Sequence, residues 1–185
     1  MINMTSDSYA AYPSLKGKTV FISGGSSGIG AELVRAFGVQ GSRVAFCGTK
    51  AGGGDALVAE LAQAGLGEPF YEACDVRDIA ALQALLERVG QKLGPIQVLV
   101  NNAGRDDRHS LDELTPEYWD NCLNINLRHQ VFAAQSVARQ LKAAGLRGSI
   151  INMGSISWMR GRPNLIGYTT SKAAISGMTR TLARE

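Results

Sequence analysis

The sequence predicts an α/β fold in which a doubly wound parallel sheet is covered by helices on both faces. Two observations lead to this prediction: short apolar runs alternate with longer amphipathic stretches, and the short runs are apolar on both sides. Strands of that kind need cover on both faces, and strand–helix alternation supplies it. Because crossovers between parallel strands are right-handed, the ligand crevice is expected at the carboxyl ends of the strands.

The elements follow one another in a regular order. Strands are predicted at residues 18–23, 42–47, 70–74, 97–101 and 149–152, and helices at 28–39, 55–64, 79–93 and 116–143, with a last helix beginning near Tyr168. Thr115 and Pro116 mark a helix start, because a hydroxyl caps the helix and proline suits its first position. Glycines that commonly close helices follow the helical stretches, at Gly41, Gly65, Gly94 and Gly145.

Length and composition indicate one domain. The chain has 185 residues, of which 45% are hydrophobic, enough for one substantial core. We expect a dinucleotide-binding domain over residues 15–185, preceded by a flexible tail at 1–14. The last helix is predicted to run to Glu185 without a cap, and we therefore expect a chain truncated after the helix that follows the fifth strand.

Composition also argues against several functions. The net charge of +3 is small and dispersed, which gives no case for nucleic acid or a membrane surface as partner. No apolar stretch reaches the roughly 20 residues of a membrane span, and the N-terminus lacks a signal-peptide pattern, so we predict a cytoplasmic protein. The cysteines, Cys47, Cys74 and Cys122, have no C-x-x-C spacing and only two histidines accompany them, so no metal is expected and buried thiols are favoured.

A glycine-rich loop follows the first predicted strand and opens the first helix. The candidate cofactor-binding residues there are Ser23, Gly24, Ser26, Ser27, Gly28, Ile29 and Gly30. Glycines let the backbone turn sharply and approach a pyrophosphate, which the N–H groups of a helix N-terminus can hold in a Rossmann-type fold. The spacing G-x-x-x-G-x-G differs from the usual G-x-G-x-x-G, and a plain turn of small residues is the alternative.

The ends of the later strands offer further cofactor contacts. No acidic residue follows the second strand before Asp55, whereas a carboxylate there would favour NAD. Thr49 and Lys50 can instead serve a 2′-phosphate, so NADP is weakly favoured over NAD, although Lys50 can equally be a solvated loop lysine. Asp75 and Val76 suit the edge of an adenine. Small residues that permit close approach to a cofactor follow the fourth strand at Asn102, Ala103 and Gly104, and both segments can also be plain strand ends.

Tyr168 and Lys172 stand four residues apart on the last helix, and Ser155 lies thirteen residues before the tyrosine. Side chains four apart share one helix face. A free phenol titrates near pH 10, and a neighbouring ammonium favours the phenolate and lowers that pKa. The pair therefore predicts a general base that works near neutral pH.

Taken together, these motifs resemble the short-chain dehydrogenase/reductase family over residues 15–185. The resemblance implies an NAD(P)-dependent oxidoreductase that forms dimers or tetramers. It implies that Tyr168 is the general acid/base, that Lys172 lowers its pKa and holds the nicotinamide ribose, and that Ser155 binds the reacting oxygen. It further implies that Asn126, which can otherwise be a plain buried polar residue, positions a water in a proton relay.

The segments around 104–109 and 154–158 bear on the substrate. The first is densely polar, and Trp158 adds an aromatic face, which together suit a hydroxyl-rich ligand bound by Ser155, Trp158 and Tyr168. A solvated loop and a core tryptophan are the alternative. Residues 106–109, 126–130 and 155–158 are similar in sequence to the aldose dehydrogenases of the family, which oxidise the anomeric carbon of a sugar to a lactone. Two other functions stay open: a carbonyl or ketoacyl reductase, and a non-catalytic dinucleotide-binding fragment.

Overall fold

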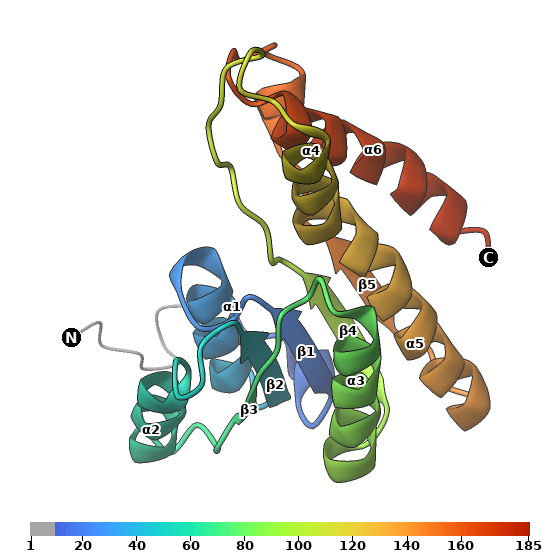
Figure 1. Ribbon diagram of the computed structural model, residues 1–185. Coiled ribbons are helices and arrows are strands. Elements are labelled where there is room, and N and C mark those ends of the chain that lie inside the picture. The colour runs from blue at the N-terminus through green and yellow to red at the C-terminus, as the bar shows by residue number, and fades with distance from the viewer. Residues whose placement is uncertain (1–9) are drawn as a thin grey trace.

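Five parallel strands form a sheet of order β3-β2-β1-β4-β5 in the computed structural model, which describes residues 10–185 (Figure 1). The strands are β1 (Thr19–Ser23), β2 (Arg43–Gly48), β3 (Phe70–Ala73), β4 (Ile96–Asn101) and β5 (Ser149–Asn152). The helices are α1 (Gly28–Val39), α2 (Asp55–Gln63), α3 (Ile79–Leu93), α4 (Pro116–Leu123), α5 (His129–Ala144) and α6 (Ile166–Leu182). The predicted doubly wound parallel sheet is confirmed.

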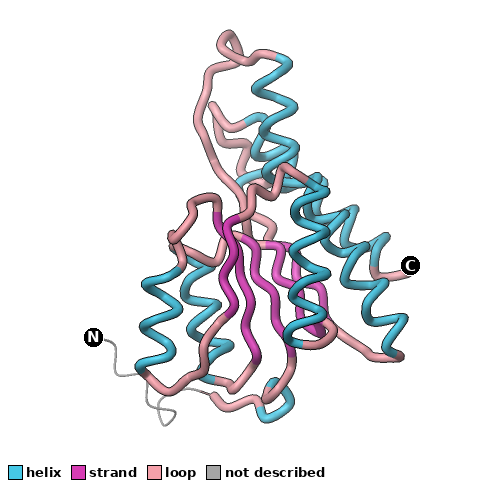
Figure 2. Tube along the Cα trace, turned by 60° about the horizontal axis from the view of Figure 1, so that its bottom comes forward, coloured by secondary structure: helices cyan, strands magenta, loops and turns pink. Residues whose placement is uncertain are grey.

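Helices lie on both faces of the sheet, and Figure 2 shows the strands between the two layers of helices. Alternate residues of β1 point to opposite faces, so that Phe21 joins one core cluster while Val20 and Ile22 join the other. The first cluster packs against α3 and α5, through Leu82, Leu85, Leu86, Val89, Ala133 and Val137. The second packs against α1 and α2, through Val34, Leu57 and Leu61. Because both faces of β1 are covered, all five of its residues are buried.

The turn chemistry follows the expected pattern. Thr115 accepts a hydrogen bond from the N–H of Tyr118, and Pro116 is the first residue of α4. The four predicted helix-closing glycines, Gly41, Gly65, Gly94 and Gly145, all have positive φ. The cysteines are free and buried, and burial raises the pKa of the Cys47 thiol to about 12. These residues therefore serve packing, as predicted for buried thiols.

Two helix predictions are corrected. The helix expected over 116–143 is interrupted by a π-helical turn at Asn124–Arg128. The side chain of Asn126 donates to the carbonyl of Cys122, four residues earlier, and so takes an acceptor that a regular α-helix would use. The last helix ends at Leu182 rather than Glu185, because i→i+3 hydrogen bonds from Arg184 and Glu185 tighten its final turn.

The chain before β1 is only partly described. Residues 1–9, most of the predicted flexible tail, lie outside the described residues, while Pro13–Leu15 form a short 3₁₀ turn. Across residues 10–185, no helix combines the length and the apolar character that crossing a bilayer requires. After β4 the chain leaves the sheet and runs to a loop that precedes α6, before it returns into α4 (Figure 1). The loop after β4 and the loop before α6 both border the candidate active site.

Candidate active site

A cleft of about 450 Å³ opens at the carboxyl ends of the strands, where the strand order reverses between β1 and β4. This is the switch point at which doubly wound sheets bind ligands. Most of the predicted cofactor residues line it: Gly24, Ser26, Ser27, Ile29, Gly30, Thr49, Asp75, Val76, Asn102, Ala103, Gly104, Tyr168 and Lys172. Ser23, Gly28 and Lys50 do not. The fold thus brings these predicted residues together from the ends of four strands, β1 to β4, and from α6.

The glycine loop is shaped by close backbone approaches. A Cβ on Gly30 would lie 2.0 Å from the carbonyl oxygen of Gly24, which leaves no room for a side chain there. Gly24 has a φ of 68°, the left-handed region that favours glycine. Ser27 is the N-cap of α1, and its side chain makes no capping hydrogen bond. The first turn of α1 thus borders the cleft with N–H groups that an anion can accept from.

Ser23 has a different position from the one predicted. It is buried at the end of β1, where its hydroxyl accepts hydrogen bonds from the backbone N–H groups of Asn102 and Ala103, each at 3.1 Å. The side chain of Asn102 donates back to the carbonyls of Ser23 and Gly24, at 3.0 and 3.2 Å. Ser23 therefore joins the loop after β4 to the glycine loop, and it stabilises two segments that line the cleft without lining the cleft itself.

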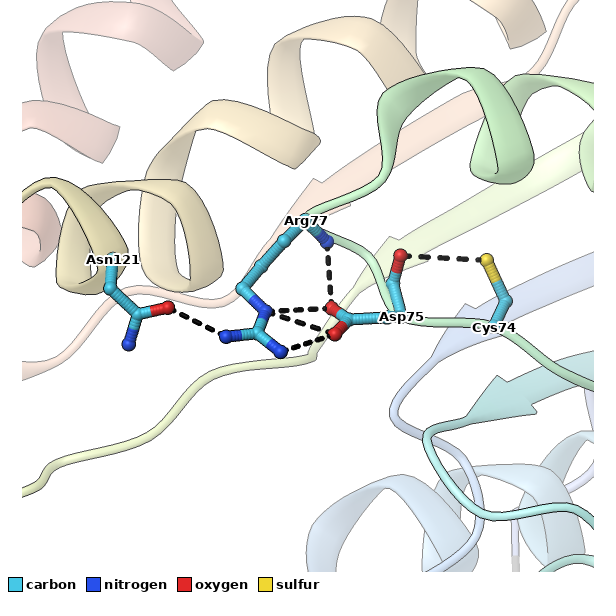
Figure 3. Close-up of polar contacts among 4 residues, drawn as sticks. All are labelled: Cys74, Asp75, Arg77 and Asn121. Carbon is cyan, nitrogen blue, oxygen red and sulfur yellow. Dashed lines mark hydrogen bonds and ion pairs between the residues drawn. The ribbon is translucent and has the colours of Figure 1, made fainter.

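The carboxylate of Asp75 is held by Arg77 (Figure 3). The guanidinium Nε lies 3.0 and 2.9 Å from the two carboxylate oxygens, and the backbone N–H of Arg77 donates to one of them at 3.0 Å. These hydrogen bonds lower the pKa of Asp75. Arg77 also donates to Asn121 of α4, at 2.7 Å. Asp75 lines the cleft, but this partner was not visible in the sequence, because a loop arginine two residues away has no fixed direction there.

Asn126 lies beneath the cleft and is fully buried. Its Oδ1 accepts from the backbone N–H of Arg105 at 2.8 Å, and its Nδ2 donates to the carbonyl of Cys122 at 3.0 Å. A Cβ on Gly104 would lie 2.8 Å from Asn126 Oδ1 and 3.5 Å from Lys172 Nζ. Asn126 therefore ties the π-helical turn to the loop after β4, and the missing side chain of Gly104 makes room for both groups.

Lys172 lies one helical turn after Tyr168 on α6. Its ammonium donates to the carbonyl of Met153 at 2.6 Å and lies 5.6 Å from the centre of the Tyr168 ring. The side chain is buried, and this burial lowers the pKa of Lys172. The Met153 carbonyl holds the ammonium beside the Tyr168 ring, and both side chains come from one face of α6. Met153 itself acts through its backbone, so its residue type carries no signal.

A second cleft, of about 200 Å³, adjoins the first at Tyr168. Ser155 lines it, and its Oγ lies 2.8 Å from the hydroxyl of Ser157. Tyr168 and Asp106 line both clefts. Trp158 lines neither cleft: the residue is 38% exposed and ends the short 3₁₀ turn Ile156–Trp158. The structure thus brings Ser155, Tyr168 and Lys172 to the junction of two clefts.

His129 is a residue that the sequence analysis missed. It begins α5, is fully buried, and its Nε2 lies 3.3 Å from the carbonyl of Ala103 in the cleft wall. Burial lowers the pKa of His129 to about 4, so the ring is neutral near pH 7. The Nε2–H tautomer then donates to Ala103. A lone histidine in an amphipathic stretch gives no sequence signal for such a supporting contact.

Comparison with known proteins agrees with this geometry. The profile described as short chain dehydrogenase matches residues 18–185. A D-xylose 1-dehydrogenase of Caulobacter vibrioides (strain NA1000 / CB15N) is 49% identical over 178 residues, which cover 96% of this chain and 69% of that protein. A probable galactose dehydrogenase of Rhizobium meliloti (strain 1021) is 42% identical over 172 residues, covering 93% and 67%.

Solved structures resemble the fold closely. A blue fluorescent protein from a metagenomic library, crystallised in complex with NADPH, superposes with a TM-score of 0.83 at 38% identity; the match covers 92% of this chain and 69% of that one. The chain thus spans about two thirds of the length of these relatives. With the profile matching nearly the whole chain and the motifs gathered at one cleft, the chain belongs to the short-chain dehydrogenase family of NAD(P)-dependent oxidoreductases.

Proposed function

We propose that the protein is an aldose 1-dehydrogenase, which removes a hydride from the anomeric carbon of a sugar and a proton from its anomeric hydroxyl to give an aldonolactone. The observation that carries this proposal is the position of Tyr168, which borders both clefts, with Ser155 in the smaller cleft and Lys172 in the larger. Relatives named as D-xylose and galactose dehydrogenases support the sugar as substrate.

The residues of the large cleft suit a nicotinamide dinucleotide. The N–H groups of the uncapped first turn of α1 can donate hydrogen bonds to a pyrophosphate. Because Gly24 and Gly30 pack closely and carry no side chains, the pyrophosphate can approach the backbone of the loop. Thr49, Asp75 and Val76 line the cleft together with Asn102 to Gly104, and the first three would hold the adenosine part of the cofactor. The bound cofactor would supply the hydride acceptor.

The protein supplies the proton acceptor and the orientation. Tyr168 takes the proton of the anomeric hydroxyl, and Ser155 donates a hydrogen bond to the same oxygen. Lys172, fixed by the Met153 carbonyl, places its ammonium beside the Tyr168 ring and within reach of the nicotinamide ribose that the cleft would hold. Asn126 holds the loop after β4 through Arg105, and we propose that its turn carries the relay water.

NADP is the cofactor we favour, with NAD as the alternative. β2 ends at Gly48 and no carboxylate follows it before Asp55, so nothing at that strand end repels a 2′-phosphate. Thr49 borders the cleft and Lys50 stands on the adjoining loop. The NADPH complex of the structural relative supports this preference. Homo-oligomerisation and a cytoplasmic location stay predictions from the sequence.

The test is the reduction of NADP and NAD, followed at 340 nm, with a panel of aldoses that includes D-xylose and D-galactose. Tyr168→Phe should lower kcat by at least roughly 10²–10⁴-fold, the usual contribution of a positioned acid/base, while dinucleotide binding measured by calorimetry is kept. Tyr12→Phe is the matched control, because Tyr12 is 57% exposed and lines neither cleft. Unchanged turnover in Tyr168→Phe would contradict the assignment of the base.

A further inference from the structure

The smaller cleft is rich in arginine. Arg108 reaches it from the loop after β4, and Arg160 and Arg162 reach it from the loop before α6. Asp106 is the acidic residue among those that line it. Three guanidinium groups against one carboxylate leave an excess of positive charge directly beside Tyr168 and Ser155. Nothing in the proposed oxidation of a neutral sugar requires that excess.

These arginines differ from the other arginines at the site. Arg77 and Arg105 are each paired with a carboxylate, Asp75 and Asp107 respectively. In residues 10–185, no ion pair within 4 Å involves Arg108, Arg160 or Arg162. Their donors are therefore free to bind a ligand, and a guanidinium suits carboxylate and phosphate because its N–H groups match two oxygens at once.

The two loops that carry the arginines are tied together. The backbone N–H of His109 donates to the carbonyl of Asn164 at 3.0 Å and joins the two loops. The hydroxyl of Tyr118 donates to the carbonyl of Asp107 at 3.0 Å and anchors the first loop to α4. The His109 ring is buried and packs on Tyr118, with ring centres 4.5 Å apart. Arg108 is therefore held next to the loop of Arg160 and Arg162, so less ordering is needed when an anion binds.

We propose that the smaller cleft is an anion subsite and that the substrate is an acidic aldose, which carries a carboxylate or a phosphate away from its anomeric carbon. This inference rests on the proposed sugar oxidation. The anomeric hydroxyl lies at Tyr168 and Ser155, and the acidic group lies at the three arginines. The acidic group takes no part in the chemistry: C1 loses a hydride, O1 loses a proton to Tyr168, and the C1–O1 bond becomes the carbonyl of the lactone.

Binding tests the subsite without turnover. Calorimetric titrations would use D-galactose, D-galacturonate, D-galactose 6-phosphate and inorganic phosphate, each with the dinucleotide present. We expect the uronate or the sugar phosphate to bind roughly 10- to 100-fold more tightly than D-galactose, the range for hydrogen bonds to charged groups. The two acidic sugars distinguish a carboxylate site from a phosphate site. Equal affinity for D-galactose and both acidic sugars, or binding of inorganic phosphate as tight as that of the sugar phosphate, would overturn the proposal.

Variants then locate the binding. Arg160→Gln combined with Arg162→Gln should lower kcat/KM and affinity for the acidic sugar roughly 10- to 100-fold and leave D-galactose within about twofold. Arg147→Gln is the matched control, because this exposed arginine precedes β5, at the opposite end of the strand from the site. Arg162→Lys should recover part of the affinity, since the charge is kept and the fork is lost.

Failure of the subsite and failure of the proposed function give different results. If the protein oxidises D-galactose and the arginine substitutions change the affinity for every sugar equally, the dehydrogenase function stands and the anion subsite is refuted. If the protein binds the acidic sugar through Arg160 and Arg162 but oxidises no sugar, the anion subsite stands and the proposed dehydrogenase function is refuted. Unchanged thermal unfolding of the arginine variants would show that the affinity changes are local.

Discussion

The floor of the large cleft and the rim of the small one hold their residues in opposite ways. The floor, residues 23–30 and 101–104, is fixed by buried groups: Ser23 and Asn102 exchange hydrogen bonds across it, and His129 supports Ala103. The rim, residues 106–108 and 155–165, presents exposed arginines and is tied mainly through backbone atoms, as between His109 and Asn164.

The difference assigns separate tasks to the two regions. Side chains on the floor have buried partners, so a substitution there leaves unsatisfied groups or a steric clash and costs stability. Exposed side chains on the rim can change with little effect on folding, because surface substitutions usually fall within ±0.5 kcal/mol. The floor can thus serve one cofactor while the rim is adapted to a particular substrate.

The largest effect on stability is expected from protonation of His129. Its folded pKa is about 4, whereas an unfolded histidine titrates near 6.5. Between these values the unfolded chain binds a proton that the folded chain does not, so stability is complete above pH 6.5 and falls as the pH drops towards 4. The full window amounts to on the order of 3 kcal/mol. Urea unfolding at several pH values measures it.

His129→Gln is the control for that measurement. Glutamine keeps a donor for the Ala103 carbonyl and does not titrate, so its unfolding free energy should fall less steeply with acid than that of the wild type. Carboxylates titrate in both proteins, and the difference between the two slopes isolates the histidine. Equal slopes would mean that the ring is protonated in the fold and that the floor is not sealed around it.

A pair of glycine substitutions compares the floor with an open position next to the rim. Gly30→Ala places a Cβ 2.0 Å from the Gly24 carbonyl and should cost roughly 1–3 kcal/mol, the usual cost of overpacking. Gly154→Ala, beside Ser155, meets nothing within 4 Å and should stay within about 0.5 kcal/mol. Urea unfolding of both variants checks the contrast. A cost at Gly154 equal to that at Gly30 would contradict the distinction between floor and rim.

The residues of the floor could be predicted from the sequence more completely than the contacts that hold them. Strand ends and glycine positions depend on local patterns, so Gly24, Gly30 and the residues after β4 were predicted as cleft residues and line the cleft. The supporting role of Ser23 and the burial of His129 depend on residues about 80 and 26 positions away, respectively, which no local pattern reveals.

Long-range effects also explain the remaining differences. At the π-helical turn two side chains compete for backbone carbonyls, Asn126 for that of Cys122 and Gln130 for that of Asn126, within a stretch whose residues all suit a helix. The prediction that Trp158 contacts substrate rested on its distance from Ser155 along the chain. The 3₁₀ turn instead leaves the indole outside both clefts. A short turn reverses direction within three residues, so closeness in sequence fixes no common direction.

The smallest effect is expected outside the floor, at the exposed pair of Arg77 with Asp75, a residue that also lines the large cleft. The two side chains are 47% and 37% exposed, and exposed pairs contribute about 0.2–1 kcal/mol. Because Arg77 lowers the folded pKa of Asp75, this contribution is present above the ordinary pKa of aspartate and is lost as the pH falls through the folded value. Arg77→Ala should therefore differ from the wild type in urea unfolding at pH 7 and converge with it in acid, with Arg77→Gln as a control that keeps hydrogen-bond donors. A loss at pH 7 as large as that of Gly30→Ala would show that burial does not set the cost of a substitution at the large cleft.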